Sequence, residues 1–266
     1  MMLELHGVQK TFNPGTVNEK VALQAVDLHL EAGDFATIVG SNGAGKSTLF
    51  NAIAGEFIAD AGTITLDGQD ITFLPDYRRS KVIGRMFQDP LKGTAPHMTI
   101  EENLALAFLR ASRQTSPFSR ITKADRTFFA GKLSALGLGL EDRMKQPVGL
   151  LSGGQRQALT LLMATMNRPK LLLLDEHTAA LDPKTALKVL TLSARLVAEN
   201  HLTTLMITHN MKDAIKYGNR LIMMHEGRII YDVSGEEKQK LHVSDLLAKF
   251  QTASGGEFAN DRMILS

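Results

Sequence analysis

The first residues whose types and spacing could do chemistry form a glycine-rich loop. Gly40 and Gly45 enclose four residues and are followed at once by Lys46 and Ser47, which is the pattern of a phosphate-binding loop. Its glycines allow backbone N–H groups to turn toward phosphate oxygens, and the N-terminus of a following helix adds partial positive charge. We expect Lys46 to bind the outer phosphates, Ser47 to bind Mg²⁺ and Thr48 to reach the inner phosphate. A loop that is glycine-rich only for close packing is the alternative. The expected nucleotide-binding residues of this loop are Gly40, Ser41, Asn42, Gly43, Ala44, Gly45, Lys46, Ser47 and Thr48.

Two carboxylates, Asp175 and Glu176, follow four leucines at 171–174. Such an apolar run is typical of a strand buried on both faces of a parallel sheet, and ligands of open parallel sheets bind at the carboxyl ends of the strands. We expect Asp175 to hold Mg²⁺ and Glu176, which points differently, to meet the attacking water. Alone, the pair could equally end a strand at the surface, but the phosphate loop favours the catalytic interpretation.

The elements that must position these groups alternate between strand and helix patterns. Apolar strand patterns cover 35–39, 171–174 and 203–207, and a helical pattern covers 46–54 and ends at Gly55. This alternation favours an α/β fold with an open, mainly parallel sheet.

Two hairpins and a helical middle complete the pattern. Asp67-Gly68 and Glu226-Gly227 lie between strand patterns, which predicts tight turns. Between about 99 and 140 the pattern is helical, and Thr122 with Asp125 predicts an N-terminal cap. One apolar face of this helix is expected to contain Phe128, Phe129, Leu133 and Leu136.

Composition excludes several classes of protein. The 266 residues include no cysteine, which excludes disulfides, thiolate zinc sites and cysteine-ligated iron–sulfur clusters. Thirty basic and 28 acidic residues give a net charge of +2, too balanced for a general nucleic-acid binder, so no nucleic acid is expected as a partner. The first residues do not predict a secretory signal, and the longest apolar run, at 158–166, is too short to predict a membrane span.

The pentapeptide Leu151-Ser152-Gly153-Gly154-Gln155 lies between the phosphate loop and Asp175. In this position and order it resembles the signature of the ATP-binding cassette (ABC) ATPases. The resemblance covers roughly 3–234. It implies the P-loop ABC-ATPase fold, with a mainly parallel sheet core, an antiparallel β subdomain and an inserted helical subdomain.

The resemblance also implies how the site is completed. In the family, two copies pair head to tail, so that the signature residues of one copy contact the γ-phosphate of ATP held by Lys46 of the other. The implied cofactors are ATP and Mg²⁺, and the implied assembly is a homodimer. The implied signature contacts are Ser152, Gly153, Gly154 and Gln155.

Four further positions match the family singly. Gln88 resembles the glutamine that touches the metal and the lytic water, and His209 resembles the histidine that contacts the γ-phosphate. Phe12 stands where an aromatic ring stacks on adenine, although a phenylalanine near a strand end could equally be core. Asp182 resembles the D-loop aspartate on the dimer axis. The resemblance therefore implies Lys46, Gln88, Glu176 and His209 as catalytic residues and Ser47, Gln88 and Asp175 as metal ligands.

The chain departs from the family at two points. The usual Glu-Pro-Thr reads Glu176-His177-Thr178, and the D-loop begins with Ala179, which has no hydroxyl. We expect His177 to be a solvated turn residue. The expected domains are an ABC ATPase domain at 1–234, with the helical subdomain at about 89–148, and a short C-terminal helix and tail at 235–266.

The expected function is to hydrolyse ATP and so power transport of a small solute through separate membrane-spanning permease subunits. The motifs resemble ATPases of amino-acid uptake systems of the tryptophan/tyrosine type, which would add a separate substrate-binding protein if the system is an importer. The expected location is the cytoplasmic face of the membrane, reached through the permease. The alternative is a soluble ABC ATPase that acts on a macromolecular assembly such as an iron–sulfur scaffold.

Overall fold

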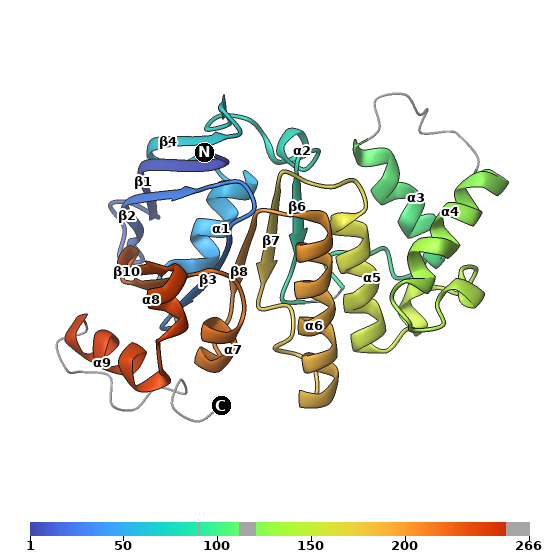
Figure 1. Cartoon of the computed structure of the whole chain (residues 1–266). Helices are drawn as coiled ribbons and strands as arrows, with labels where there is room; N and C mark the ends of the chain where they lie inside the picture. Colours follow the sequence, from blue (N-terminus) through green and yellow to red (C-terminus); the bar gives the residue numbers. More distant parts are fainter. Residues whose placement is uncertain (90, 112–120, 254–266) are drawn as a thin grey trace. The chain divides into compact units, whose positions relative to one another are not determined.

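A computed structural model describes residues 1–89, 91–111 and 121–253. The expected tail after 253, the central part of the expected helical subdomain at 112–120, and residue 90 lie outside the described residues. The described chain divides into two compact units, one of Met1–Arg79 with the segment from His201 onward, and one of Ser80–Asn200 (Figure 1).

The first unit contains an antiparallel sheet with the strand order β2-β1-β4-β5. Its strands are β1 (Leu3–Phe12), β2 (Lys20–Leu30), β4 (Ala61–Leu66) and β5 (Gln69–Asp70). The predicted turn between β4 and β5 is confirmed, because Asp67 and Gly68 have φ of 49° and 74°, the positive values that a type I′ turn requires.

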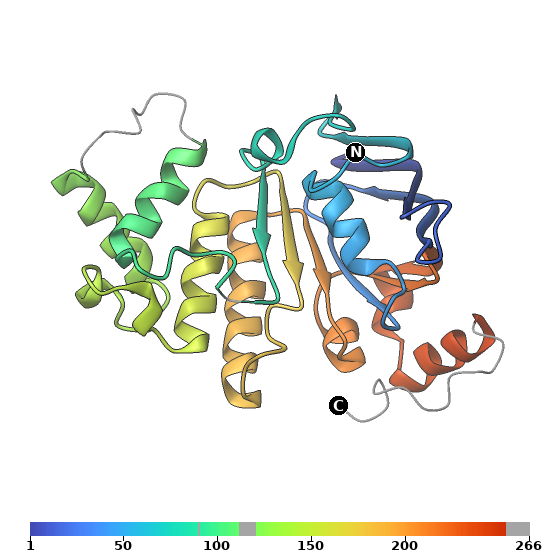
Figure 2. The same ribbon diagram turned by 180° about the vertical axis from the view of Figure 1, so that it is seen from behind.

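The same unit contains the strands that lead to the phosphate loop. β3 (Phe35–Gly40) is parallel to both β8 (Thr204–Ile207) and β9 (Arg220–His225), and β10 (Arg228–Ser234) is antiparallel to β9. All six residues of β3 are buried. Helix α1 lies beside β2 and β3 (Figure 2). The helices of this unit are α1 (Lys46–Ala54), α2 (Asp76–Arg79), α7 (Met211–Lys216), α8 (Gly235–Gln239) and α9 (Val243–Ala253).

The second unit pairs β6 (Ile83–Met86) with β7 (Leu171–Asp175) in parallel. The described helical elements of this unit are α3 (Ile100–Ala111), α4 (Lys123–Ser134), α5 (Gly153–Thr165), α6 (Pro183–Asn200) and the 3-10 turns η1 (Glu141–Arg143) and η2 (Val148–Leu150). Helices α3, α4 and α5 share one apolar core.

The middle segment confirms one local prediction and corrects another. Thr122 and Asp125 form the predicted capping box at the start of α4. Phe129, Leu133 and Leu136 are buried as expected, but Phe128 is 41% exposed, because it lies at the margin of the face that packs on α3 and contacts the rings of Phe108 and Phe129. Among the described helices, none is long and apolar enough to cross a bilayer.

Candidate functional site

The phosphate loop connects the end of β3 to α1 and is held by its neighbours in the first unit. A Cβ on Gly40 would lie 2.2 Å from the Met224 carbonyl oxygen of β9, and one on Gly45, whose φ is +96°, would lie 2.6 Å from the Ala22 oxygen of β2. Both distances are too short for any side chain. The loop therefore takes its path because only glycine allows the neighbouring backbones to approach so closely.

Lys46 is 5% exposed and lies within this loop. Its Nζ donates to the carbonyl oxygens of Gly40 at 2.6 Å and of Ser41 at 2.9 Å. These contacts compensate the burial of a charged group. They place the ammonium at the start of the loop, where the sequence predicted a cation for the phosphates.

His209 lies two residues after the end of β8 and is half-buried. Because Ile207 pairs with Ile38 of β3, the carboxyl ends of two adjacent parallel strands carry the phosphate loop and His209. The Asn210 side chain then accepts hydrogen bonds from the backbone N–H groups of Lys212 and Asp213 and so caps α7. This cap fixes where the chain turns after His209.

Phe12 is half-buried at the end of β1. Its ring makes an edge contact with Phe57 at 5.5 Å between centroids, and Lys10 Nζ lies 5.7 Å from its centre. In the β1–β2 ladder its partner is Lys20, a residue that the sequence analysis missed. Only the pairing register of β1 and β2 places Lys20 opposite Phe12, and this register cannot be predicted from the sequence of either strand because the ladder has register shifts.

In the second unit, Gln88 and the two carboxylates lie at the carboxyl ends of neighbouring parallel strands, since Met86 of β6 pairs with Leu174 of β7. Gln88 is exposed, whereas Asp175 is buried with the Arg85 guanidinium 3.9 Å from its Oδ2. Glu176 has a φ of +43°, a left-handed conformation that is uncommon for a non-glycine residue. The extended backbone of β7 thus ends at Asp175, and Glu176 takes a different backbone conformation.

His177 is not the solvated residue that we expected. It is 2% exposed, and its Nε2 lies 3.0 Å from the Ser193 hydroxyl oxygen on α6. That hydroxyl donates its hydrogen to the Val189 carbonyl oxygen, so a neutral His177 donates from Nε2 to Ser193. Burial lowers the pKa of His177 to about 4. The loop after Glu176 is thus fastened to α6.

The signature pentapeptide forms the N-terminus of α5. The Ser152 hydroxyl accepts from the Gln155 backbone N–H at 3.3 Å, and the Gln155 side chain accepts from the Ser152 N–H. A Cβ on Gly154 would lie 2.3 Å from Thr185 Cγ2 on α6, and one on Gly153 would lie 3.0 Å from Leu181 Cδ2. The signature glycines therefore let α5 pack closely on the start of α6.

The exposed Asp182 directly precedes α6. Its Oδ1 accepts from the Thr185 backbone N–H at 3.1 Å. Hydrogen bonds from Thr185, the side chain first and then the backbone, hold the pKa of Asp182 below its usual value. Asp182 and Gly154 of the signature thus both contact Thr185.

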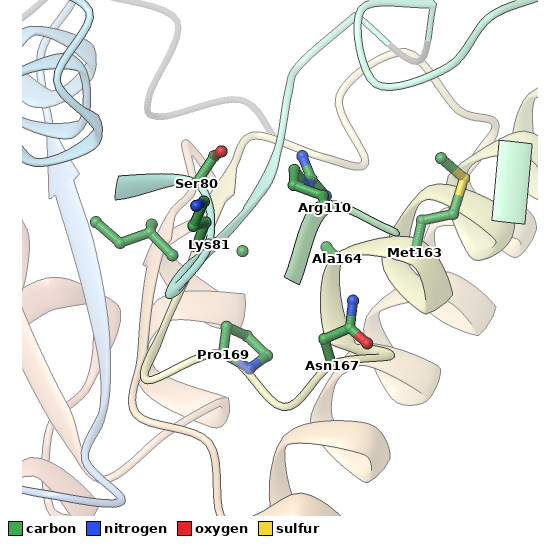
Figure 3. A pocket seen from close by; sticks show the side chains of 9 residues that line it. Ser80, Lys81, Arg110, Met163, Ala164, Asn167 and Pro169 are labelled. Atoms are coloured by element: carbon green, nitrogen blue, oxygen red, sulfur yellow. The ribbon is translucent and has the colours of Figure 1, made fainter. Parts of the chain in front are cut away.

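A small surface pocket lies elsewhere in the second unit, at the start of β6 and the end of α5 (Figure 3). Lys81, Arg110 and Asn167 are among the residues that line it. None of the predicted site residues lines this pocket.

Comparison with known proteins identifies the family. A family model described as "ABC transporter" matches residues 23–179. The chain is 42% identical over 257 residues to a tyrosine transport ATP-binding protein of Clostridioides difficile (strain R20291). The matched region covers 95% of this chain and 100% of that protein. The chain belongs to the ABC transporter family. It is also 34% identical to the lipoprotein-releasing system ATP-binding protein LolD of Ruegeria sp. (strain TM1040), over 86% of this chain and 97% of that one.

Solved ABC cassettes have the same fold. A dimeric cassette in a post-hydrolysis state with ADP and Pi gives a TM-score of 0.75 at 29% identity, covering 88% of this chain and 98% of that chain. A nucleotide-free cassette gives 0.74 at 29% identity, covering 93% and 95%. These findings confirm the predicted ABC-ATPase fold. The protein is an ATP-binding ABC subunit that hydrolyses ATP to power transport, so a soluble iron–sulfur scaffold ATPase is not favoured.

We predict that Gly154→Ala lowers the free energy of unfolding by about 1 kcal/mol. The new Cβ would clash with the Thr185 methyl group, which cannot easily move away because a β-branched side chain is restricted at χ1. The free-energy cost of this overpacking exceeds the gain in helix propensity from glycine to alanine. Urea unfolding measures the change. Adding Thr185→Ser, which removes that methyl group, should restore the stability; a single variant more stable than wild type would contradict the packing argument.

His177 should make the protein less stable in acid. Its folded pKa of about 4 lies below the usual value of about 6.5, so between these values the unfolded chain binds more protons and acid favours unfolding. The wild type should lose about 3 kcal/mol through this group as the pH falls from 6.5 to 4. Urea unfolding at several pH values should show a shallower slope for His177→Gln, whereas the exposed control His97→Gln should match wild type. Equal slopes for wild type and His177→Gln would show that burial does not hold His177 neutral.

Proposed function

We propose that two copies of this subunit pair head to tail around two Mg²⁺–ATP molecules. Lys46, Ser47 and Thr48 bind the phosphates of one nucleotide, and Ser152 to Gln155 of the other copy contact its γ-phosphate. Phe12 stacks on the adenine, His209 contacts the γ-phosphate, and Asp182 lies on the dimer axis. The family membership and the dimeric cassette with ADP and Pi support this assignment.

Magnesium fits the donor atoms that the proposal gives it. Ser47, Gln88 and Asp175 supply a hydroxyl, an amide oxygen and a carboxylate, and Mg²⁺ prefers few carboxylates together with phosphate oxygens and waters. Among the described residues, no three His, Cys, Asp or Glu side chains form a group that could hold a metal alone. Ser47, Gln88 and Asp175 would hold the ion together with the nucleotide phosphates, and its charge would screen theirs. Glu176 would orient the attacking water.

The solute we propose is an aromatic amino acid. The observation that carries this proposal is the 42% identity to a tyrosine transport ATP-binding protein along its whole length. Separate membrane-spanning subunits form the path, a substrate-binding protein delivers the solute if the system imports, and this subunit lies on the cytoplasmic face of the membrane.

The domains we propose are an ATPase domain at 1–234, with a helical subdomain near 89–148 that contacts the permease, and a C-terminal segment at 235–266.

Glu176→Gln should bind ATP and Mg²⁺ but hydrolyse it at least a hundredfold more slowly, because the side chain no longer accepts a proton from the attacking water. A tight dimer should then accumulate, measurable by size-exclusion chromatography with light scattering. Adding Lys46→Ala or Ser152→Arg should keep this variant monomeric, by removing the phosphate contact or by obstructing the signature surface. A monomeric Glu176→Gln at saturating ATP would refute the head-to-tail pairing.

The solute class can be tested on the assembled transporter. The tagged subunit, extracted from its native membranes with detergent, should bring membrane-spanning proteins with it. Reconstituted in vesicles with any substrate-binding protein that accompanies it, the complex should hydrolyse ATP several-fold faster with tyrosine or tryptophan than without a solute. Spermidine is the matched control; stimulation by spermidine and not by aromatic amino acids would refute the proposed solute.

A further inference from the structure

Lys20 places a second cation at the phosphate loop. It begins β2, and its side chain reaches the loop, because a Cβ on Gly43 would lie 3.8 Å from Lys20 Nζ. Two residues further along β2, the Ala22 carbonyl oxygen would lie 2.6 Å from a Cβ on Gly45. The start of β2 therefore runs along the part of the loop from Gly43 to Gly45.

The pairing of β1 with β2 also places Lys20 beside the proposed adenine-stacking ring. Phe12 and Lys20 are direct partners in this antiparallel ladder, and side chains of directly opposed residues lie on the same face, about 5 Å apart at Cβ. One lysine thus connects the two parts of the proposed nucleotide site that belong to the first unit. A molecule with its base at Phe12 and its phosphates at the loop would pass Lys20.

The charge of Lys20 is available for a ligand. The side chain is exposed, and within 1–89, 91–111 and 121–253 it makes no hydrogen bond or ion pair. Its neighbour Lys10 is different, because its Nζ lies 2.7 Å from Asp60. Lys46 is different too, since its ammonium donates to the loop's own carbonyl oxygens.

We propose that Lys20 binds the polyphosphate of the nucleotide held by the same copy, as a second phosphate-binding cation beside Lys46. The inference rests on the proposed nucleotide site and adds to it a residue outside the glycine-rich motif. An ammonium next to exposed backbone N–H groups attracts a multivalent anion more strongly than the loop alone. Its contribution depends on ionic strength, because the lysine is exposed.

The test compares nucleotide affinity of the full chain at low and high salt. At 50 mM salt, Lys20→Ala should weaken ATP binding about threefold to tenfold, as expected for an exposed charge pair with a phosphate, and Lys20→Arg should retain the affinity. At 500 mM salt the difference between Lys20→Ala and wild type should shrink to less than twofold. Calorimetric titration of each variant with ATP measures these affinities.

Lys240→Ala is the matched control, because Lys240 is exposed in the same unit and, among the described residues, forms its ion pair with Glu236. It should bind ATP like wild type, and none of the three variants should change the melting temperature without nucleotide. If Lys20→Ala binds ATP as tightly as Lys240→Ala at low salt, while Lys46→Ala does not bind ATP, the proposed role of Lys20 is refuted and the proposed phosphate loop is not. Unimpaired binding by Lys46→Ala would instead refute the proposed phosphate loop.

Discussion

The site depends on one property of parallel strands, that the chain leaves each of them at the same edge of the sheet. In the first unit, β3 leads into the phosphate loop, and its neighbour β8 leads into His209. In the second unit, β6 leads toward Gln88, and its neighbour β7 ends at Asp175 and is followed by Glu176. Strands that are buried on both faces hold these ends still, so the polar groups follow rigid elements although they themselves stand on loops.

Close backbone approach is the second requirement, and it explains where glycine is needed. At Gly40 and Gly45 the neighbouring carbonyl oxygens of β9 and β2 leave no room for a Cβ. The glycines therefore let β9 and β2 support the loop from outside. Lys46 lies within the same loop and is held by its carbonyl oxygens.

Local chemistry made much of this predictable from the sequence. The phosphate loop, the positive-φ turn at Asp67 and Gly68, and the capping box at Thr122 each depend on residues within a few positions of one another. The burial of His177 and the position of Lys20 could not be predicted, because both depend on partners that are distant in the sequence. Ser193, the partner of His177, lies on the next helix, and Lys20 faces Phe12 only through a ladder with irregular register. The prediction that Phe128 belongs to the buried face was wrong, because the helical period of apolar residues indicates the direction of the buried face but not how wide that face is.

Helix α6 contacts two segments of the second unit, the loop after β7 and the N-terminus of α5. Near its middle, Ser193 fastens His177 and so the loop that carries Glu176, and at its start Thr185 packs against Gly154 of the signature. In the proposed head-to-tail pair, Glu176 serves the nucleotide bound by its own copy, whereas the signature serves the nucleotide of the other. A shift of α6 would therefore move a catalytic group of one site together with a phosphate contact of the second.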